Sequence, residues 1–337
     1  MENSIKSVLV MGGAGYLGSM LTEQLIKAGF KVTIFDSLLF TDNHIKDLIE
    51  SEQCELIQGD IRDSKSVGKA VKEHDAVILL SALVGEGACD RDPDDTVSVN
   101  ILGSQNVIEA CRYYKTKRFI FASTDSCYGI QTGILTELSG LNPISLYAES
   151  KTLIEQRIFT AFHEDTQKTM GVARESYPWN PTILRMGTLY GLSRRMRFDL
   201  VVNILTWQAA MSGTIPIYGG DQWRPLVHVR DAAKAYLAVL NAPDELVSGQ
   251  VFNVGSNPQN IQIKDLGKII AKEFPEAQTE FVPQSPDLRD YHVDFSKINS
   301  TLGWEADWTI SKGIKEIKES ILSGKFGKEI LPIYRNS

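Results

Sequence analysis

The fold of this 337-residue chain is decided by the stretch Val8-Leu9-Val10-Met11-Gly12-Gly13-Ala14-Gly15-Tyr16-Leu17-Gly18. An apolar run leads into a glycine-rich turn, and a helical pattern over Tyr16–Ala28 follows and ends at Gly29. Glycine permits backbone angles that a Cβ forbids, and it lets a pyrophosphate approach the main chain at a helix N-terminus. The spacing Gly13-x-Gly15-x-x-Gly18 therefore predicts a dinucleotide site, and the alternative is a strand–turn–helix without a ligand.

A carboxylate follows the second predicted strand. The apolar run Val32–Phe35 ends in Asp36, about 20 residues after the turn, where an acidic residue binds the hydroxyls of the adenosine ribose. A carboxylate repels a 2′-phosphate, and no arginine follows it closely, since Ser37-Leu38-Leu39 comes next. The sequence therefore predicts NAD, rather than NADP, as the cofactor.

Strand and helix patterns alternate through the first half of the chain. Such alternation predicts a parallel sheet with helices on both faces, and ligands bind at the carboxyl ends of its strands. The predicted fold class is α/β, a doubly wound Rossmann sheet with a smaller C-terminal substrate-binding lobe. The candidate strands are Ser7–Met11, Val32–Phe35, Glu55–Gln58, Ala76–Leu80, Phe119–Ala122 and Thr182–Arg185.

The second half of the chain has a looser rhythm. A short strand at Val227–Val229, a helix at Asp231–Leu240 and a strand at Val251–Val254 could return to the first sheet. We therefore expect an NAD-binding domain at residues 1–185 plus about 227–255, and a smaller lobe over the cofactor at about 186–226 and 256–337. The stretch Thr166–Trp179 is expected to be a surface excursion without chemistry.

Composition excludes several classes of protein. The net charge of −7 argues against a nucleic-acid partner, and no apolar run is long enough to span a membrane. The N-terminus lacks the apolar core of a signal peptide. The cysteines and histidines lack the spacing of metal ligands, so we expect no metal and reduced thiols in a cytoplasmic protein. The cysteines are Cys54, Cys89, Cys111 and Cys127.

A Tyr-x-x-x-Lys pair, Tyr147 and Lys151, lies between the predicted fifth and sixth strands. Residues four apart share one face of a helix. The ammonium and a nicotinamide charge would both favour the phenolate and lower a tyrosine pKa that is ordinarily near 10. Tyr147 is therefore a candidate general base that takes a hydroxyl proton as hydride leaves the same carbon. The alternative is an ordinary helix surface.

These motifs occur in the order found in a known family. The chain resembles, from end to end, the extended short-chain dehydrogenases that act on nucleotide sugars, the NAD-dependent epimerases and dehydratases. The matching pieces are Gly12–Gly18, Gly59-Asp60-Ile61, Ser81-Ala82-Leu83-Val84-Gly85, Asn100-Ile101-Leu102-Gly103, Ser123-Thr124-Asp125-Ser126-Cys127-Tyr128-Gly129, Tyr147-x-x-x-Lys151, Arg224-Pro225-Leu226-Val227-His228-Val229-x-Asp231 and Tyr291-His292-Val293-Asp294-Phe295-Ser296-Lys297.

Three further pieces resemble a narrower subgroup. It includes dehydrogenases that oxidise C4 of GDP-linked heptoses, together with many epimerase/dehydratase relatives of unassigned substrate. The pieces are Ala82-Leu83-Val84-Gly85 with Cys89, Arg195-Met196-Arg197-Phe198-Asp199-Leu200-Val201-Val202-Asn203 and Asp287-Leu288-Arg289-Asp290-Tyr291.

The resemblance implies a set of residues around the cofactor. Asp60 and Ile61 match an adenine-contacting pair, although Asp60 could instead cap the next helix. Asn100 matches a polar residue that steadies the helices of the site, and Lys151 matches the residue that holds the nicotinamide ribose. The implied cofactor-binding residues are Gly12, Gly15, Tyr16, Leu17, Asp36, Asp60, Ile61, Ser81, Ala82, Val84, Asn100, Ser123, Tyr147, Lys151 and Gly187.

The resemblance also implies the residues that meet the sugar and its diphosphate. Thr124 matches the hydroxyl that hydrogen-bonds the reacting oxygen, so the implied catalytic set is Thr124, Tyr147 and Lys151. Epimerases place an arginine where this chain has Gln284, and Arg289 could substitute for it; Arg195 is a further candidate, whereas His228 is expected to be structural. The implied substrate-binding residues are Val84, Thr124, Asp125, Ser126, Thr188, Arg197, Arg224 and Arg289, with Thr188 replacing an asparagine of the epimerases.

The residue after Asp125 bears on the type of reaction. The 4,6-dehydratases of this family carry Thr-Asp-Glu where this chain has Thr124-Asp125-Ser126, so the usual base for elimination is missing. The resemblance therefore implies oxidation at C4 of a nucleotide-diphosphate sugar, by a 4-epimerase or a C4 dehydrogenase. A 4,6-dehydratase stays open through Asp125. A non-catalytic NAD(P)-sensing protein is the alternative of another class, although such proteins usually lack the tyrosine–lysine pair.

Members of this family form dimers through helices that here follow Asn100 and surround Tyr147–Phe162. These segments carry apolar residues on more than one face, which a homodimer or burial inside one chain explains about equally well.

Overall fold

The computed structural model describes residues 5–168, 179–283, 287 and 289–336. The glycine turn and Asp36 lie at the carboxyl ends of two strands in a central seven-stranded sheet. Every strand pair in this sheet is parallel. In spatial order its strands are β11 (Gln250–Val254), β7 (Pro181–Met186), β5 (Arg118–Thr124), β4 (Ala76–Leu79), β1 (Ser7–Met11), β2 (Lys31–Asp36) and β3 (Cys54–Gln58).

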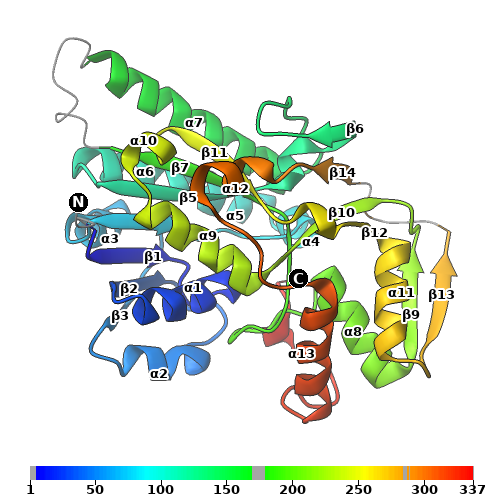
Figure 1. Cartoon of the computed structure of the whole chain (residues 1–337). Helices are drawn as coiled ribbons and strands as arrows, with labels where there is room; N and C mark the ends of the chain where they lie inside the picture. Colours follow the sequence, from blue (N-terminus) through cyan, green and yellow to red (C-terminus); the bar gives the residue numbers. More distant parts are fainter. Residues whose placement is uncertain (1–4, 169–178, 284–286, 288, 337) are drawn as a thin grey trace.

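Helices cover both faces of this sheet (Figure 1), which confirms the doubly wound architecture. On one face, apolar residues of α1 (Tyr16–Lys27) and α9 (Val229–Asn241) form a core with the sheet. On the other face, α3 (Ser64–Lys72), α6 (Ser104–Tyr113) and α7 (Leu146–Lys168) form a second core. The first helix begins at Tyr16 as predicted and ends at Lys27, one residue earlier than predicted, with Gly29 at φ +87° just after it.

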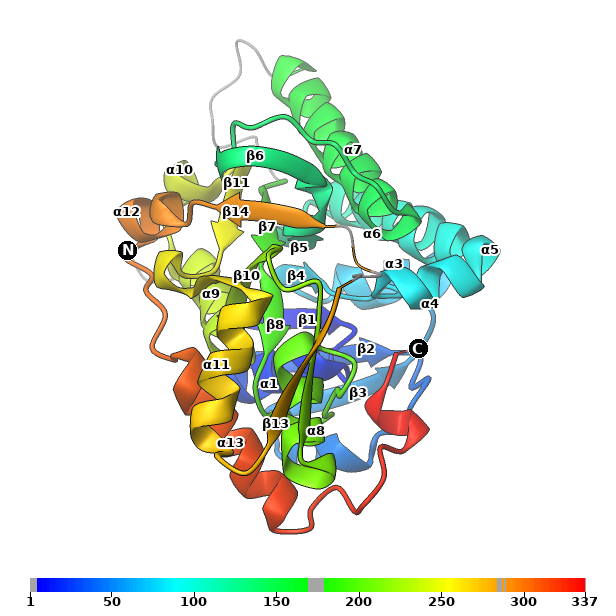
Figure 2. The same ribbon diagram turned by 90° about the vertical axis from the view of Figure 1, so that its right-hand side faces the viewer.

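The smaller lobe packs beside the carboxyl edge of the sheet (Figure 2). It has its own apolar core, shared by α8 (Val201–Ser212), α11 (Ile263–Glu273) and α13 (Ile310–Leu322). Its strands are β8 (Thr188–Tyr190), β10 (Trp223–His228) and β12 (Asn260–Gln262) in one sheet, β9 (Thr214–Tyr218) with β13 (Gln278–Val282), and β14 (Asp290–Val293) with β6 (Ile130–Leu135).

Of the two strands expected to return to the main sheet, one is confirmed and the other is wrong. Val251–Val254 lies in β11, which pairs with β7 in the main sheet. The predicted strand at Val227–Val229 instead belongs to β10, which pairs with β8 and β12. The main sheet already ends at β11, so β10 forms hydrogen bonds within the smaller lobe and only the following helix, α9, packs on the main sheet.

Shorter elements connect these parts. The stretch after α4 (Glu86–Arg91) continues through α5 (Pro93–Thr96) into a π-helical segment that leads directly into α6. No helix in the described ranges is long and apolar enough to cross a membrane. Residues 169–178, which hold most of the predicted surface excursion, lie outside the described residues. The short elements are η1 (Asn43–Ile45), α2 (Lys46–Ile49), α4 (Glu86–Arg91), α5 (Pro93–Thr96), η2 (Val97–Gly103), η3 (Asp125–Tyr128), α10 (Asp244–Val247), η5 (Asn257–Gln259), α12 (Ser296–Leu302) and η6 (Pro332–Tyr334).

Candidate active site

A cavity of about 820 Å³ opens at the carboxyl ends of the central strands, between the sheet and the smaller lobe. Its size is that of a site for cofactors and small substrates. The wall contains most of the predicted site residues. These are Gly12, Gly15, Tyr16, Leu17, Asp36, Asp60, Ile61, Ser81, Ala82, Val84, Ser123, Thr124, Ser126, Tyr147, Lys151, Gly187, Thr188, Arg197, Arg224 and Arg289.

The glycine turn presents bare main chain to the cavity. A Cβ at Gly12 would lie 2.8 Å from the Ser81 amide nitrogen, and one at Gly18 would overlap the carbonyl oxygen of Gly12 and lie 2.8 Å from the Cα of Gly13. Gly12 also has φ +85°, which side chains disfavour. The turn lies at the N-terminus of the 12-residue helix α1, whose free N–H groups favour a phosphate. These features fit the pyrophosphate of NAD.

Asp36 lies at the end of β2 beside this turn. Its two carboxylate oxygens accept the amides of Ala14 at 3.0 Å and Leu38 at 2.9 Å, so the carboxylate holds both flanking loops. Burial raises the pKa of Asp36, while these two amides oppose the rise. Asp36 lines the cavity, and its carboxylate oxygens have further lone pairs that can accept hydrogen bonds from the hydroxyls of an adenosine ribose.

Asp60 and Ile61 follow β3 in the same part of the wall. The carboxylate of Asp60 accepts the amide of Arg62 at 2.8 Å and pairs with its guanidinium. The alternative role for Asp60 as a helix cap is wrong, because Asp63 caps α3 by accepting the amide of Lys65. Asp60 is therefore left beside the cavity.

Asn100 is the one predicted cofactor residue that does not line the cavity. Its Oδ1 accepts the amide of Leu83 at 2.8 Å, and its Nδ2 donates to the carbonyl of Leu83 at 3.0 Å and to Ser150 Oγ at 3.3 Å. It thus ties the loop after β4 to helix α7. This position matches the steadying role, one layer behind the wall that includes Ser81, Ala82 and Val84.

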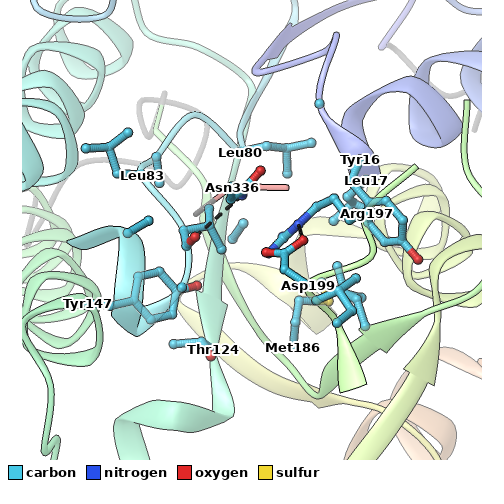
Figure 3. A pocket seen from close by; sticks show the side chains of 18 of the residues that line it. Tyr16, Leu17, Leu80, Leu83, Thr124, Tyr147, Met186, Arg197, Asp199 and Asn336 are labelled. Carbon is cyan, nitrogen blue, oxygen red and sulfur yellow. Dashed lines mark hydrogen bonds and ion pairs between the residues drawn. The ribbon is translucent and has the colours of Figure 1, made fainter. Parts of the chain in front are cut away.

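Tyr147, Lys151 and Thr124 meet where the two lobes join (Figure 3 shows Tyr147 and Thr124 side by side). Burial raises the pKa of Tyr147 well above its ordinary value, Glu86 adds to the rise, and a hydrogen bond with Thr124 opposes it. Lys151 Nζ donates to the carbonyl of Ala122 at 2.9 Å, and burial lowers its pKa to about 8. Without the cofactor, burial therefore dominates the pKa of Tyr147, and the lowering expected from the lysine and the nicotinamide charge together stays a prediction for the NAD-bound protein.

Asp125 and Ser126 differ in their placement. Asp125 is 1% exposed, lies outside the cavity wall, and both of its carboxylate oxygens lack a partner among the described residues. Burial raises its pKa well above the ordinary range. Ser126 lines the cavity, and its hydroxyl accepts a hydrogen bond from Arg289 Nη1 at 3.2 Å. Of this pair, only Ser126 reaches the wall.

Arg224 and Arg289 lie together in the same wall and share a carboxylate, Asp287. Arg224 Nη2 lies 2.8 Å and Arg289 Nη2 2.6 Å from its Oδ2. Burial opposes ionisation of Asp287, but the Arg289 and Arg224 guanidiniums hold its pKa well below the usual range. Arg289 Nη1 also lies 3.0 Å from Glu86 Oε1. Gln284, for which Arg289 could substitute, lies outside the described residues.

Arg197 and Arg195 lie on the cofactor side of the cavity rather than with Arg224 and Arg289. Figure 3 shows Arg197 close to Tyr16 and Leu17 of the glycine turn. Its guanidinium forms a two-pronged pair with Asp199, at 3.0 Å and 2.5 Å. Arg195 stacks on the ring of Phe40, with 3.5 Å from Cζ to the ring centroid.

His228 has the structural role that the sequence predicts. It caps α9 by accepting the amide of Arg230, and its Nε2 lies 2.7 Å from Glu316 Oε1. Its ring stacks on Trp308 at 4.1 Å. None of these contacts faces the cavity.

Sequence reasoning missed several residues around the cavity. Glu86, Asp287, Asp199 and Asn336 line it, and a signal existed for Asp199 and Asp287, which lie two residues from a predicted arginine. Behind the wall, Arg185 and Glu155 form a buried ion pair at 2.7 Å, and Glu155 also accepts the hydroxyl of Ser123. No spacing rule links these partners, which come from β7 and α7.

Proteins of known sequence and structure are similar to nearly all of the chain. The putative UDP-glucose 4-epimerase of Methanocaldococcus jannaschii is 29% identical over 319 residues, covering 92% of this chain and 96% of the relative. The dTDP-glucose 4,6-dehydratase of Xanthomonas campestris pv. campestris is 28% identical over 336 residues, covering 91% and 90%. The solved UDP-glucuronic acid 4-epimerase from Bacillus cereus, in complex with UDP-glucuronic acid and NAD, superposes with a TM-score of 0.81 at 25% identity and covers 94% of this chain and 99% of that chain.

A family model also matches. It spans residues 8–255, well over half of the chain, and includes the glycine turn, Asp36 and the pair Tyr147 and Lys151. The cavity fits NAD at the same residues. The chain therefore belongs to the NAD dependent epimerase/dehydratase family, and its cofactor is NAD.

Proposed function

We propose that this protein oxidises the C4 hydroxyl of a nucleotide-diphosphate sugar, as a 4-epimerase or a C4 dehydrogenase, with Tyr147 as the base. The observation that carries the proposal is that Tyr147, Thr124 and Lys151 lie together in the cavity wall. They lie beside the part of the cavity that fits NAD, which we call the cofactor half. A phenol and a hydroxyl that share a hydrogen bond can both reach the oxygen of one sugar hydroxyl.

The protein's own part in this reaction is the transfer of the hydroxyl proton to Tyr147. Bound NAD⁺ would accept the hydride from C4 and place a positive charge beside Tyr147. The buried phenol has a raised pKa, so any cation brought next to it stabilises the phenolate strongly in this low-dielectric setting. Tyr147 then takes the hydroxyl proton while Thr124 holds the oxygen, and the product is a 4-keto sugar.

The part of the cavity wall around Arg224 and Arg289, which we call the substrate half, supplies groups for the diphosphate and the nucleoside of the substrate. Arg224 and Arg289 would bind the diphosphate, because guanidinium groups suit phosphate oxygens. Both arginines already pair with Asp287, so the diphosphate would compete with that carboxylate for them. Apolar and amide side chains farther along the wall, Leu205, Gln208, Pro216, Tyr218 and Gln222, would receive the nucleoside.

A 4,6-dehydratase is the second candidate, because relatives of that name are as similar to the chain as the 4-epimerases. Elimination of water from the sugar needs an acid and a base in addition to Tyr147. Ser126 cannot serve as the base, and Asp125 lies outside the cavity wall. We therefore place the dehydratase second.

The test is to incubate the purified protein with UDP-, GDP-, CDP- and dTDP-sugars and to follow NADH absorbance and sugar products by NMR. A stereoisomer without net NADH identifies an epimerase, and a 4-keto sugar with stoichiometric NADH identifies a C4 dehydrogenase. A 4-keto-6-deoxy sugar would contradict the proposal in favour of elimination.

The matched variant is Tyr147→Phe, which removes only the hydroxyl. We expect it to lower kcat by about 10²–10⁴-fold with NAD still bound. Unchanged turnover would exclude Tyr147 as the base. If no sugar reacts with the wild type and Tyr147→Phe changes nothing, the non-catalytic NAD(P)-sensing alternative gains support.

We also propose that the protein is a cytoplasmic homodimer. The apolar side chains Val97 and Leu102 are 39% and 55% exposed on η2, ahead of helix α6, where the family's dimer helices lie. Such exposed residues are easily buried against a second copy. Size-exclusion chromatography with light scattering tests this proposal, and a strictly monomeric protein contradicts it.

A further inference from the structure

The last described segment of the chain crosses the cofactor half of the cavity. In Figure 2 it runs in red beside the ends of β2 and β3. The carbonyl of Tyr334 accepts the amide of Phe198 at 2.8 Å, and the Tyr334 ring packs edge-on against Phe198 and Phe326 at 6.0 and 5.4 Å. These contacts anchor the segment Pro332–Asn336, which we call the strap, to the smaller lobe.

Asn336, at the far end of the strap from its anchor, reaches the opposite wall. Asn336 Nδ2 donates to the carbonyl of Val84 in the loop after β4 at 3.4 Å, and its main-chain N–H donates to the Asp199 carboxylate. Figure 3 shows Asn336 between Leu83 on one side and Arg197 with Asp199 on the other. The strap thus bridges the two lobes across the cavity. Asn336 Oδ1 is buried in this wall without a partner among the described residues, so an acceptor is left for a ligand.

The strap also accepts a hydrogen bond from Arg195, an arginine that forms no ion pair within the described residues. Arg195 is 6% exposed, lines the cavity, and donates from Nη2 to the carbonyl of Arg335 at 3.2 Å. Its Nε is buried without a hydrogen-bond partner among the described residues. Burial lowers the pKa of Arg195 to about 10, so the guanidinium remains charged at neutral pH.

The other arginines of the described cavity wall differ from Arg195 in this respect. Each of them pairs with at least one carboxylate, whereas Arg195 has none within ion-pair distance. A buried cation without a counter-ion is costly unless a ligand supplies the charge. Arg195 lies on Phe40, in the loop that follows Asp36, and it lines the same cavity as Asp36 and the glycine turn that fits the phosphates.

We propose that the strap closes the cofactor site and presents the Arg195 guanidinium to the phosphates of NAD, with Asn336 as a further hydrogen-bonding group to the cofactor. The two phosphates bring the negative charge that Arg195 lacks, alongside the N-terminus of α1. Release of NAD then requires the strap to leave Val84 and Asp199. The consequence is a cofactor that stays on the protein between turnovers. This inference concerns NAD alone and does not rest on the reaction at C4.

The test measures how fast NAD leaves the holoprotein. Holoprotein is diluted into excess unlabelled NAD after loading with radiolabelled NAD, and the retained label is counted over time. We expect the rate of loss to rise about tenfold or more for Arg195→Ala and for deletion of residues 332–337, and about threefold for Asn336→Ala. Arg335→Ala is the matched control, because it removes an exposed guanidinium and keeps the carbonyl that accepts from Arg195; it should lose NAD at the wild-type rate.

A second measurement separates a cofactor contact from ordinary packing. The melting temperature of each variant is recorded with and without saturating NAD. Without NAD, we expect the melting temperatures of Asn336→Ala and Arg195→Lys to match that of the wild type. With NAD, we expect these melting temperatures to rise less than that of the wild type. Equal rates of NAD loss in the deletion and the wild type, or equal destabilisation of the free and bound forms by Asn336→Ala and Arg195→Lys, would overturn the proposal.

Discussion

The two halves of the cavity are built in different ways. At the glycine turn, the cofactor half presents main chain: the turn from Gly12 to Gly18, with Asp36 joining two loops through their amides. The substrate half consists of side chains whose charges already neutralise one another, with Asp287 between Arg224 and Arg289. The turn and Asp36 are close together in the sequence, so local structure forms this part of the cavity. The substrate half is held by ion pairs between remote segments, so the same kind of substitution should have different consequences in the two.

The largest effect is expected from adding one methyl group to the cofactor half, in Gly18→Ala. The new Cβ would overlap the Gly12 carbonyl and press on Gly13 at 2.8 Å, so strand and helix would have to separate. Overpacking of this kind lowers the free energy of unfolding by about 1–3 kcal/mol, and the displaced turn should no longer bind NAD. Urea denaturation and the NAD content of the purified protein measure both effects.

The control for Gly18→Ala is Gly140→Ala, since a Cβ there meets no atom within 4 Å. We expect NAD content and stability close to those of the wild type. A Gly18→Ala protein that keeps stoichiometric NAD would show that the turn is not as rigid as its packing indicates.

The cofactor half could be predicted from the sequence because its parts are close together in the chain. Strand, turn, helix and the carboxylate of Asp36 all fall within 30 residues, and local rules connect them. Tyr147 and Lys151 share one helix, so their spacing alone places them together. Of the two roles open to Asp60, the structure removes the helix cap, because Asp63 caps α3, and the contact with adenine stays a prediction.

The substrate half and the layers behind it depend on contacts that no spacing reveals. Glu86 meets Arg289 across 203 positions, and Arg185 meets Glu155 from another element. The sequence also shows the lysine near Tyr147 but not the burial that dominates the tyrosine pKa when no cofactor is bound. Burial and long-range pairing are properties of the folded chain.

A pH profile tests the junction of the two halves, where Lys151 lies. Its folded pKa is about 8, against about 10.4 in an unfolded chain. Between pH 8 and 10 the unfolded state of the cofactor-free protein therefore binds more protons, so the free energy of unfolding should rise with pH, by on the order of 2 kcal/mol. Below pH 8 the cost of burying the charged lysine is present in full.

The comparison is between wild type and Lys151→Met in urea, both without NAD, at intervals from pH 7 to 10. The variant should lack this rise, and the difference between the two proteins isolates Lys151 from other titrating groups. Lys268→Met, on an exposed pair with Asp265, should follow the wild type. Parallel profiles for wild type and Lys151→Met would mean that the lysine is better solvated than its burial indicates.

The smallest effect is expected in the substrate half, from Ser126→Ala. The variant loses the hydrogen bond from Arg289 Nη1 at 3.2 Å and a longer one between Ser126 Oγ and Tyr291 Oη at 3.5 Å, while Asp287 and Glu86 still hold the guanidinium. We expect the KM for the nucleotide sugar to rise about threefold to tenfold, as loss of the one hydrogen bond on Arg289, worth about 1 kcal/mol, implies, with NAD content unchanged and stability close to that of the wild type. Ser300→Ala, at an exposed position of helix α12, is the control. Because ion pairs position Arg289 redundantly, a loss of NAD in Ser126→Ala would contradict the division of the cavity into two independently built halves.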